Sequence, residues 1–352
     1  MTAPLDEPGA PRDGEALDEA ALGGYLRAHA GLDGPLVVRQ FPKGHSNLTY
    51  LVQVGDRELV LRRPPFGSKV KSAHDMGREH RVLSALHGRY PAPRPVALCE
   101  DPSVLGASFY VMERLRGVIV RKDFVGEPPP PDVVRRVHTS LVERLADLHA
   151  LDAGAVGLGE LGKPEGYVER QVTGWAKRYQ ASQTDDVPVV EQIARHLAAH
   201  LPRESGAALI HNDYKLDNVV LAQDDLASVV GVLDWEMCTL GDPWMDLGTA
   251  LGYWMDPDDD EALQLIRWAP TTLPGSLSRR EVLALYEART GRAVVDPAYY
   301  YAFGLWKTAI VLQQIYYRYK QGLTKDARFA PLGLAVKVLC DQAARALDRG
   351  HV

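Results

Sequence analysis

The sequence predicts an α+β protein with two lobes: a small lobe with a five-stranded antiparallel sheet and one helix, and a larger, mostly helical lobe. Two observations support this division. Short runs rich in β-branched residues, separated by turn residues, dominate the first third of the chain. From about residue 131 onward, apolar residues recur at helical spacing, and a short hairpin interrupts them before residue 234. We therefore expect a disordered tail over residues 1–16, a first lobe over 17–116 and a second lobe over 117–352.

Composition and charge exclude several classes of protein. The 352 residues are 46% hydrophobic and 24% charged, and the formal net charge is −6. This is ordinary for a globular protein and unlike the basic balance of a general nucleic-acid binder. No run approaches the roughly 18 apolar residues of a membrane span, and the acidic start of the chain is unlike a signal peptide. With three scattered cysteines, we expect a cytoplasmic protein that binds neither nucleic acid nor membrane.

The first lobe begins with a segment rich in proline, glycine and acidic residues, which favours disorder over residues 1–16. Asp18 can then cap a helix over 19–30. The turn at 42–47 contains Gly44 and Ser46, whose backbone and hydroxyl groups can bind phosphate, and a plain hairpin turn is the other interpretation. Strands are predicted over residues 36–40, 48–54, 58–63, 96–100 and 108–113.

A further helix is predicted from Ser72, its N-cap, to about His87. Glu79 falls on the apolar stripe of this helix, where a carboxylate is costly unless it is paired. Arg62 on the preceding strand is the expected partner. Arg63 points to the opposite face by strand alternation and is the second choice, after Arg62, for a cation on this strand that would bind phosphate. A Glu79 side chain that reaches solvent at the edge of the stripe is the alternative.

The helices of the second lobe are predicted from apolar residues at spacings of three and four, with cap residues at their starts. Asp132, Ser278 and Asp296 are the expected N-caps of three helices, and Pro243 suits the first turn of a fourth. The acidic stretch 256–261 is either a solvated loop or a patch that recruits a polycationic substrate. The other expected helices lie near residues 167–179, 188–201 and 331–347.

Residues 211–218 read His-Asn-Asp-Tyr-Lys-Leu-Asp-Asn and lie between an apolar strand and a predicted hairpin that ends on Asp234. Phosphoryl transfer relies on positioning and charge neutralisation. Asp213 can orient an attacking hydroxyl and accept its proton, and Lys215 can reach the transferred phosphate. The hairpin should bring Asp234 beside Asn218, and both offer the oxygen ligands that Mg²⁺ prefers.

The other residues of this segment have supporting roles at most. His211 is expected to brace the loop by hydrogen bonding rather than to act as an acid or base. A metal hydrolase that uses His211 and Asp213 would need further His ligands, and the sequence lacks them at usable spacing. No Gly-x-x-x-x-Gly-Lys-[Ser/Thr] pattern occurs, so the chain is not a P-loop enzyme.

The pattern His-x-Asp-x-Lys-x-x-Asn, followed by a hairpin and Asp, resembles the catalytic loop and metal-binding Asp of protein-kinase-like enzymes. The stretches HNDYKLDN, VLDWE and GDPWMDLG resemble the aminoglycoside/choline phosphotransferase branch. Within that branch, residues 60–65, 71–86 and 162–179 are similar to the kinase-like domains fused to acyl-CoA dehydrogenases. The resemblance covers roughly residues 35–350 and implies a bilobal protein-kinase-like fold.

The resemblance implies a kinase that uses ATP and Mg²⁺. Arg62 would hold the nucleotide phosphates where protein kinases place a lysine. Asp246 would hydrogen-bond the catalytic loop, and a surface carboxylate at a helix N-terminus is the alternative. The turn at 42–47 would be the flap over the nucleotide, and the hinge after the last strand would contact adenine. The implied nucleotide-binding residues are Gly44, Ser46, Asn47, Arg62, Glu79, Met112 and Leu115.

The acceptor implied by this likeness is a small-molecule alcohol, a hydroxylated acyl-CoA such as a 4-hydroxyacyl-CoA. An aminoglycoside or a choline-like amino alcohol is the alternative. A hypothesis of another class is a catalytically silent nucleotide-binding module. Such a module has no chemical need for the full set of Asp213, Lys215, Asn218 and Asp234.

Overall fold

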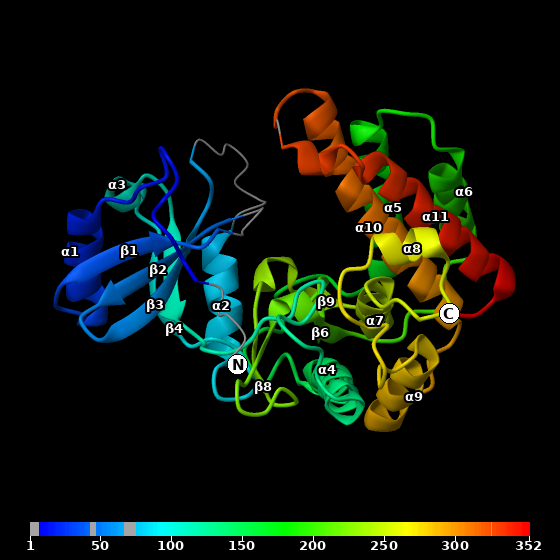
Figure 1. The fold of residues 1–352 in the computed structure, drawn as a ribbon, viewed down its shortest axis with the longest axis horizontal. Coiled ribbons are helices and arrows are strands. Elements are labelled where there is room, and N and C mark those ends of the chain that lie inside the picture. Colours follow the sequence, from blue (N-terminus) through cyan, green and yellow to red (C-terminus); the bar gives the residue numbers. More distant parts are fainter. Residues whose placement is uncertain (1–6, 43–46, 67–74, 325) are drawn as a thin grey trace. The chain divides into compact units, whose positions relative to one another are not determined.

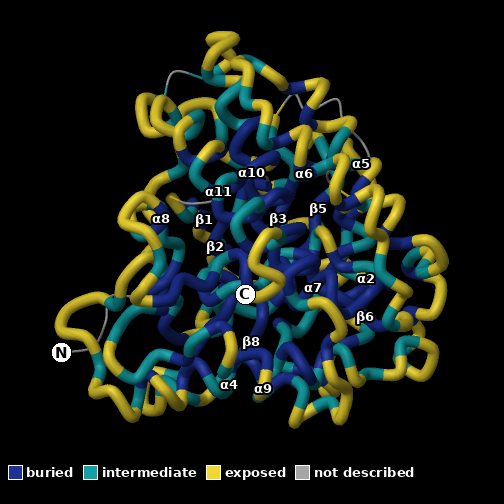
Figure 2. Tube along the Cα trace, turned by 90° about the vertical axis from the view of Figure 1, so that its right-hand side faces the viewer, coloured by how far each residue is buried: buried dark blue, intermediate teal, exposed yellow. Residues whose placement is uncertain are grey.

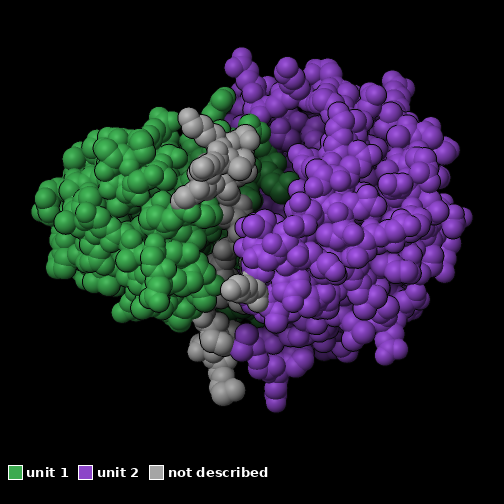
Figure 3. Space-filling model, turned by 90° about the horizontal axis from the view of Figure 1, so that it is seen from above, with its two compact units in different colours: residues 1–119, 218–238 green, residues 120–217, 239–352 purple. Residues whose placement is uncertain are grey.

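The computed structural model describes residues 7–42, 47–66, 75–324 and 326–352. The chain divides into two compact units (Figure 3). Unit 1 contains residues 1–119 and 218–238, and unit 2 contains residues 120–217 and 239–352. The segment 218–238, which we expected in the second lobe, thus belongs by its contacts to unit 1. Val118 and Leu221 show why, since each accepts a backbone hydrogen bond from the other, at 2.8 and 2.9 Å.

A five-stranded antiparallel sheet with strand order β1-β2-β3-β5-β4 forms the centre of unit 1, as the sequence predicts. Helices α1 (Glu19–Ala30) and α2 (Met76–Leu86) lie on opposite sides of this sheet (Figure 1). Side chains alternate along each strand, so Leu61 faces the core beneath α1 while Arg62 faces α2. The strands are β1 (Leu36–Gln40), β2 (Leu48–Val54), β3 (Arg57–Arg63), β4 (Pro95–Cys99) and β5 (Phe109–Glu113).

The described part of the N-terminal segment packs on the sheet, so the expectation of disorder over residues 1–16 is wrong there. Gly9 exchanges two backbone hydrogen bonds with Gln40, at 2.9 and 2.8 Å. The hydroxyl of Tyr50 donates to the carbonyl of Glu15 at 2.7 Å. The physical reason is that β1 is an edge strand, whose unpaired backbone groups are available to any neighbouring segment.

Helix starts in unit 1 follow the predicted caps in one case and differ in another. Asp18 caps α1 by accepting from the amide of Ala21 at 2.9 Å. The cap of α2 is Asp75, which accepts from the amide of Arg78 at 2.9 Å, and not Ser72, which lies outside the described residues. A short helix α3 (Pro102–Leu105) occupies the turn between β4 and β5.

A short hairpin completes unit 1. Its strands are β7 (Val219–Leu221) and β8 (Val229–Val232), and the 3₁₀ turn η3 (Trp235–Met237) follows. Gly231 gives β8 its close approach to the first part of the chain, because a Cβ there would lie 2.2 Å from Cδ1 of Leu115. The amide of Val232 also donates to the carbonyl of Pro91 at 2.8 Å.

Unit 2 is mostly helical, and its longest helix, α10 (Pro297–Lys320), is buried along its first half (Figure 2). The small strands β6 (Ala208–Ile210) and β9 (Thr239–Gly241) pair antiparallel. The 3₁₀ turns are η2 (Leu216–Asn218), which leads into unit 1, and η4 (Ala327–Phe329). The other helices are α4 (Pro131–Ala150), α5 (Tyr167–Ser182), α6 (Pro188–Ala199), α7 (Pro243–Gly252), α8 (Glu261–Leu265), α9 (Arg279–Thr290) and α11 (Leu332–Arg349).

Three of the four helix starts predicted in unit 2 are confirmed. Ser278 forms a capping box with Glu281, Asp296 accepts from the amide of Tyr299, and Pro243 begins α7. Helix α4 instead starts at Pro131, so Asp132 lies in the first turn and is not the cap. Proline suits this position because its φ is preset and it has no amide hydrogen to satisfy.

Helices α7 and α10 cross at two glycines. A Cβ on Gly248 would lie 2.1 Å from the carbonyl oxygen of Tyr300, and a Cβ on Gly304 would lie 2.0 Å from the carbonyl oxygen of Gly248. The two backbones can approach this closely only without side chains at the crossing. The crossing fixes Asp246 on α7 and Lys307 on α10 relative to each other. Among the described residues, no helix is long and apolar enough to cross a membrane.

Candidate functional site

In unit 1, Arg62 and Glu79 form the ion pair that the sequence predicts. The Glu79 side chain is only 1% exposed, so its carboxylate depends on this partner. Burial raises the pKa of Glu79, and the positive charge of Arg62 opposes that shift. The pair fixes one arm of the guanidinium group against α2.

The other arm of Arg62 points to the segment after β8. Its Nη2 donates to Oδ1 of Asp234 at 3.0 Å and lies 3.6 Å from Oε2 of Glu236. Nδ2 of Asn47 donates to the same Glu236 oxygen at 2.8 Å. Burial alone would lower the pKa of Arg62, but the carboxylates of Glu79, Asp234 and Glu236 outweigh it and raise that pKa. Arg62 is therefore a permanent cation beside the expected metal ligand.

Asn218 and Asp234 come together at the base of the β7–β8 hairpin, as predicted. The amide of Leu233 donates to the carbonyl of Asn218 at 2.8 Å. Asp234 itself adopts the left-handed conformation, with φ of 65°, which turns the chain sharply after the hairpin. An amide oxygen and a carboxylate oxygen from one hairpin fit Mg²⁺, which binds few protein ligands and keeps sites for phosphate oxygens.

The other residues predicted to bind the nucleotide are not all described by the structure, and those that are lie in different surroundings. Gly44 and Ser46 lie outside the described residues. Met112 is buried on the same face of the sheet as Arg62, and Leu115 packs against Gly231. Their contact with adenine stays a prediction. Arg63 lies on the opposite face and donates to the carbonyl of Leu105 at 2.8 Å, which makes it a structural residue.

In unit 2, Asp213 is held through both carboxylate oxygens. The hydroxyl of Tyr253 donates to Oδ1 at 2.7 Å, and Nζ of Lys215 donates to Oδ2 at 2.8 Å. Burial would lower the pKa of Lys215, but Tyr253 and Asp213 outweigh it, so that the pKa lies above its usual value. Lys215 is therefore charged at neutral pH and lies where it can neutralise an anionic group next to Asp213.

Asp246 anchors the loop that carries Asp213. Its carboxylate accepts from the amides of His211 and Asn212, both at 2.7 Å, and from Nε2 of His149 at 3.1 Å. Burial would raise the pKa of Asp246, but His149 and His211 outweigh it and keep that pKa below its usual value. Of the two interpretations of Asp246, the bond to the loop is the one observed.

His211 braces the loop from within. Its Nδ1 accepts from the amide of Asp213 at 3.2 Å, and its ring contacts the ring of Tyr214 edge to face. The next residue, Asn212, adopts the left-handed conformation with φ of 67°. The hydroxyl of Tyr167 donates to its side-chain oxygen at 3.0 Å, and Nζ of Lys307 donates to its carbonyl at 2.5 Å.

The sequence did not predict the contacts of Glu236 with Arg62 in unit 1, or those of His149, Tyr253 and Lys307 with the catalytic loop and Asp246 in unit 2. Tyr253 had no readable signal, because it lies just beyond the end of α7 and 40 positions from Asp213 in the chain. Lys307 had one, as a lysine inside the apolar run 302–312. His149 and Glu236 had none, since their partners are known only from the tertiary structure.

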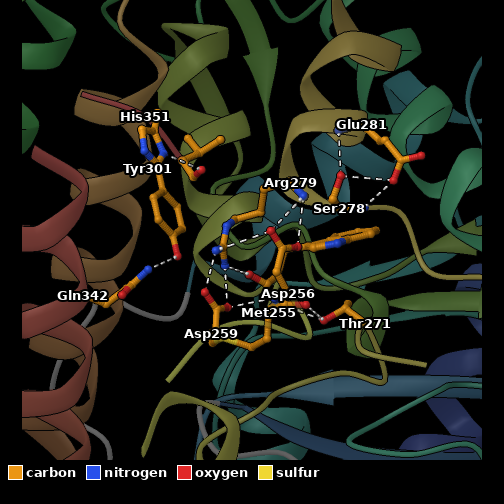
Figure 4. Close-up of polar contacts among 12 residues, drawn as sticks. Met255, Asp256, Asp259, Thr271, Ser278, Arg279, Glu281, Tyr301, Gln342 and His351 are labelled. Atoms are coloured by element: carbon orange, nitrogen blue, oxygen red, sulfur yellow. Dashed lines mark hydrogen bonds and ion pairs between the residues drawn. The ribbon is translucent and has the colours of Figure 1, made fainter. Parts of the chain in front are cut away.

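Three of the five acidic residues in the stretch 256–261 pair with arginines, and Figure 4 shows the pairing of Arg279 with two of them. Arg279 donates to both carboxylate oxygens of Asp259, at 2.6 and 2.7 Å. Its backbone amide donates to Asp256 at 3.1 Å, and Arg345 pairs with Asp260 at 2.8 Å. These carboxylates hold α9 and α11 to the loop before α8. The observation favours a structural role over the recruitment of a polycation.

A cavity of about 30 Å³ lies beside the catalytic loop within unit 2. Lys215 and Tyr253 form part of its wall, and most of the remaining wall is apolar. The apolar lining comes mainly from α4 and α7 and includes Leu141, Val142, Leu145, Leu247 and Leu251. Lys215 and Tyr253, which both bond Asp213, therefore also border apolar surface.

The family model described as the phosphotransferase enzyme family matches residues 37–278. The chain belongs to this family. This confirms the expected class, a phosphotransferase with an alcohol group as the acceptor. The expected resemblance to the kinase-like domains fused to acyl-CoA dehydrogenases is confirmed as well. The chain is 35% identical to acyl-CoA dehydrogenase family member 10 of Mus musculus over 340 residues. Acyl-CoA dehydrogenase family member 11 of Rattus norvegicus is also 35% identical, over 330 residues.

Solved structures of this family share the fold. A candidate aminoglycoside phosphotransferase from Ralstonia eutropha matches with a TM-score of 0.79 and 32% identity, over 94% of this chain and 99% of that one. An aminoglycoside phosphotransferase solved with ADP and hygromycin B matches with a TM-score of 0.59 and 17% identity, over 93% and 98%. The second likeness concerns the fold alone, and it confirms the protein-kinase-like architecture.

The match to the curated relatives is local. It covers 95% and 87% of this chain but only 31% and 40% of the mouse and rat relatives. The chain therefore spans only about 31–40% of the length of these relatives. The activity of a whole relative is not carried over by such a match.

Proposed function

We propose that this chain is an ATP- and Mg²⁺-dependent kinase that transfers the γ-phosphoryl group to the hydroxyl of a small molecule. The observation that supports this proposal is that hydrogen bonds fix both the carboxylate of Asp213 and the backbone of its loop. Tyr253 and Lys215 bond its two carboxylate oxygens, and Asp246 anchors the backbone of its loop. A carboxylate fixed in this way can orient an acceptor hydroxyl and take its proton.

In the proposed reaction, the acceptor oxygen attacks the γ-phosphorus while the bond from that phosphorus to the ADP oxygen breaks. The hydroxyl proton passes to an oxygen of Asp213. Lys215 stabilises the negative charge of the transferred group, and Arg62 holds the other nucleotide phosphates. Asn218 and Asp234 would hold Mg²⁺, which neutralises phosphate charge when it is bound.

For the acceptor, we propose a hydroxylated acyl-CoA. Asp256, Asp259 and Asp260 are already paired with arginines, which reduces the number of carboxylates in this stretch that could bind an aminoglycoside. The wall of the small cavity beside Lys215 and Tyr253 is mainly apolar and, among the described residues that line it, contains no carboxylate that would bind an amino sugar. The relatives named as acyl-CoA dehydrogenase family members agree with this choice. A choline-like amino alcohol or an aminoglycoside, as in the neighbour solved with hygromycin B, is the alternative.

The test is a transfer assay with γ-labelled ATP and Mg²⁺, offered hydroxyacyl-CoAs, aminoglycosides, choline and ethanolamine. Replacing Asp213 by Asn should lower kcat by about 10²–10⁴-fold, as expected for loss of a general base. Nucleotide affinity, measured by calorimetry, should stay nearly unchanged. The matched control is Asp217→Asn in the same loop, because Asp217 pairs with Arg121 and has no proposed role in proton transfer.

Four outcomes of this assay separate the hypotheses. Transfer to hydroxyacyl-CoA that is lost in Asp213→Asn supports the proposal. Transfer to an aminoglycoside or amino alcohol instead overturns the acceptor assignment and keeps the kinase. Mg²⁺-dependent ATP binding without transfer to any acceptor favours a silent nucleotide-binding module, and absence of nucleotide binding overturns the proposed function.

A further inference from the structure

Lys307 is a buried cation in the interior of unit 2. It lies on α10 and is 4% exposed, although lysine is almost never buried to this extent unless it is paired. Its Nζ donates to the backbone carbonyl of Asn212 at 2.5 Å. Nζ also lies 5.8 Å from the ring centroid of Trp175 on α5. A buried ammonium group is costly, so its contact with the catalytic loop calls for a physical explanation.

Asn212 immediately precedes Asp213 and is held at three polar groups by three helices. Its amide donates to Asp246 of α7 at 2.7 Å, and its side-chain oxygen accepts from Tyr167 of α5 at 3.0 Å. Its carbonyl accepts from Lys307 of α10. Asn212 needs this support because its left-handed backbone conformation, with φ of 67°, is unfavourable for a residue with a Cβ.

We propose that Lys307 is a positioning residue, whose buried ammonium group fixes the carbonyl of Asn212 and thereby the orientation of the Asp213 carboxylate. The inference rests on the proposed role of Asp213 as the group that orients the acceptor. Lys307 acts through the peptide unit that joins Asn212 to Asp213, and it need not touch either substrate. A charged donor suits this task because a charge-assisted hydrogen bond is roughly twice as strong as a neutral one.

The charge on Lys307 depends on pH within an accessible range. Burial lowers the pKa of Lys307 to about 8. Asp213 of the loop and Asp246 of α7 oppose this shift, while Lys215 of the loop and Arg178 of α5 add to it. The ammonium group is thus largely present at pH 7 and largely lost by pH 9. Its hold on Asn212 should weaken over the same interval.

The first experiment compares the full-length protein with Lys307→Met, which keeps the side-chain length and removes the donor. We expect kcat to fall about tenfold or more, the effect of losing one such hydrogen bond, while KM for ATP changes little. Hydrogen exchange of the amides at 211–213, followed by mass spectrometry, should speed up by about the same factor. The control is Lys320→Met, an exposed lysine at the end of the same helix, which should change neither.

A second variant tests the charge itself. Lys307→Arg keeps a positive charge at every accessible pH, so its kcat should lack the decline that the wild type shows above pH 8. A wild-type kcat together with wild-type loop exchange in Lys307→Met overturns the inference. If Lys307→Met fails to fold, a pH profile of Lys307→Arg identical to that of the wild type overturns it instead.

The loop-exchange measurement keeps this inference separate from the proposed function. If the wild type transfers no phosphate to any acceptor, the proposed function fails. Exchange at 211–213 then still decides whether Lys307 holds the loop, because it needs no substrate.

Discussion

At the scale of single residues, Arg62 is expected both to stabilise the buried Glu79 and to bind the nucleotide phosphates. A double substitution can separate these two roles. Replacing Arg62 by Met leaves Glu79 buried without its partner, which should cost about 3–5 kcal/mol of stability. Replacing both residues by Met removes the unpaired charge and should restore most of that stability. Nucleotide affinity should stay about 10–100-fold reduced in both variants, because the phosphate contact is gone. Urea unfolding and calorimetry with ATP measure the two effects independently.

Arg63→Met is the matched control for this pair of variants. It removes the other buried arginine of β3, from the next position, whose side chain lies on the opposite face of the sheet. It should reduce stability and leave nucleotide affinity unchanged. Wild-type ATP affinity in the double variant would contradict the role proposed for Arg62.

Lys307 also predicts a pH dependence of stability with a definite sign. Its pKa of about 8 in the folded protein lies below the 10.5 of a free lysine, so between these values the unfolded chain binds more protons. The stability that this group contributes therefore rises with pH from about 8 to 10.5, because the cost of burying a charge disappears. Relative to Lys307→Met, the wild type should gain up to about 3 kcal/mol over this interval. Urea unfolding of both proteins at pH 7, 8.5 and 10 measures it, and a difference that is constant with pH would contradict it.

A contact was predictable from the sequence where a residue is out of place in its local pattern and so requires a partner. Glu79 on an apolar stripe requires a partner, and Arg62 is the nearest cation on the preceding strand, so the pair was predictable. Tyr253 and His149 satisfy Asp213 and Asp246 from 40 and 97 positions away in the chain. Such contacts leave no local pattern, which is why the catalytic loop was predictable and its supports were not.

At the scale of elements, the crossing of α7 and α10 should tolerate no side chain. Gly248→Ala or Gly304→Ala places a Cβ about 2 Å from a backbone carbonyl oxygen and should destabilise the protein by about 1–3 kcal/mol or more through overpacking. Because α7 carries Asp246 and α10 carries Lys307, kcat should fall as well. Thermal unfolding and the transfer assay measure these effects.

The control for the crossing is Gly24→Ala, also within a helix but with open space where the Cβ would be. This change should raise stability by about 0.5–1 kcal/mol, because alanine has the higher helix propensity. Equal effects at Gly24 and Gly248 would mean that the close approach of α7 and α10 does not limit the fold.

Helix starts were predictable where the sequence offers one candidate cap residue, and less so where it offers several. Asp18, Ser278 and Asp296 cap the helices expected of them. Ser72 and Asp75 both precede the stripe of α2, and Asp75 is the one that accepts the amide hydrogen bond. The N-terminal segment was misjudged because its composition signals disorder, while the open edge of β1 offers it backbone partners.

At the scale of the whole molecule, neither unit is a single stretch of chain. Unit 1 needs the hairpin segment 218–238 as well as residues 1–119. The two expected lobes were readable from periodicity, but the assignment of this segment was not. Its contacts with Pro91, Leu115 and Val118 join parts of the chain more than 100 residues apart. The loop 211–218 consequently passes from unit 2 to unit 1 after residue 217. Asp213, proposed to orient the acceptor, belongs to unit 2, whereas Asn218 and Asp234, proposed to bind the metal, belong to unit 1.

This organisation predicts that residues 1–119 alone form an incomplete unit. Joining residue 119 to residue 218 by a short glycine-serine linker, with the chain ending at 238, should give a fragment that unfolds cooperatively. It should exceed residues 1–119 in stability by about 3 kcal/mol or more, because Val219, Val220 and Leu221 are almost fully buried in the full chain. The pairing of Val118 with Leu221 makes a short linker sufficient.

Tryptophan fluorescence gives a direct readout, because Trp235 is the one tryptophan in the sequence of this spliced fragment. It is 1% exposed and packs edge to face against Tyr90. A blue-shifted emission that turns red in a single urea transition would show that the hairpin has docked. The matched fragment carries Gly231→Leu, whose side chain would collide with Leu115, and it should emit as an exposed tryptophan. Red emission from both fragments, or equal stability of the spliced fragment and residues 1–119, would contradict the assignment of the hairpin to unit 1.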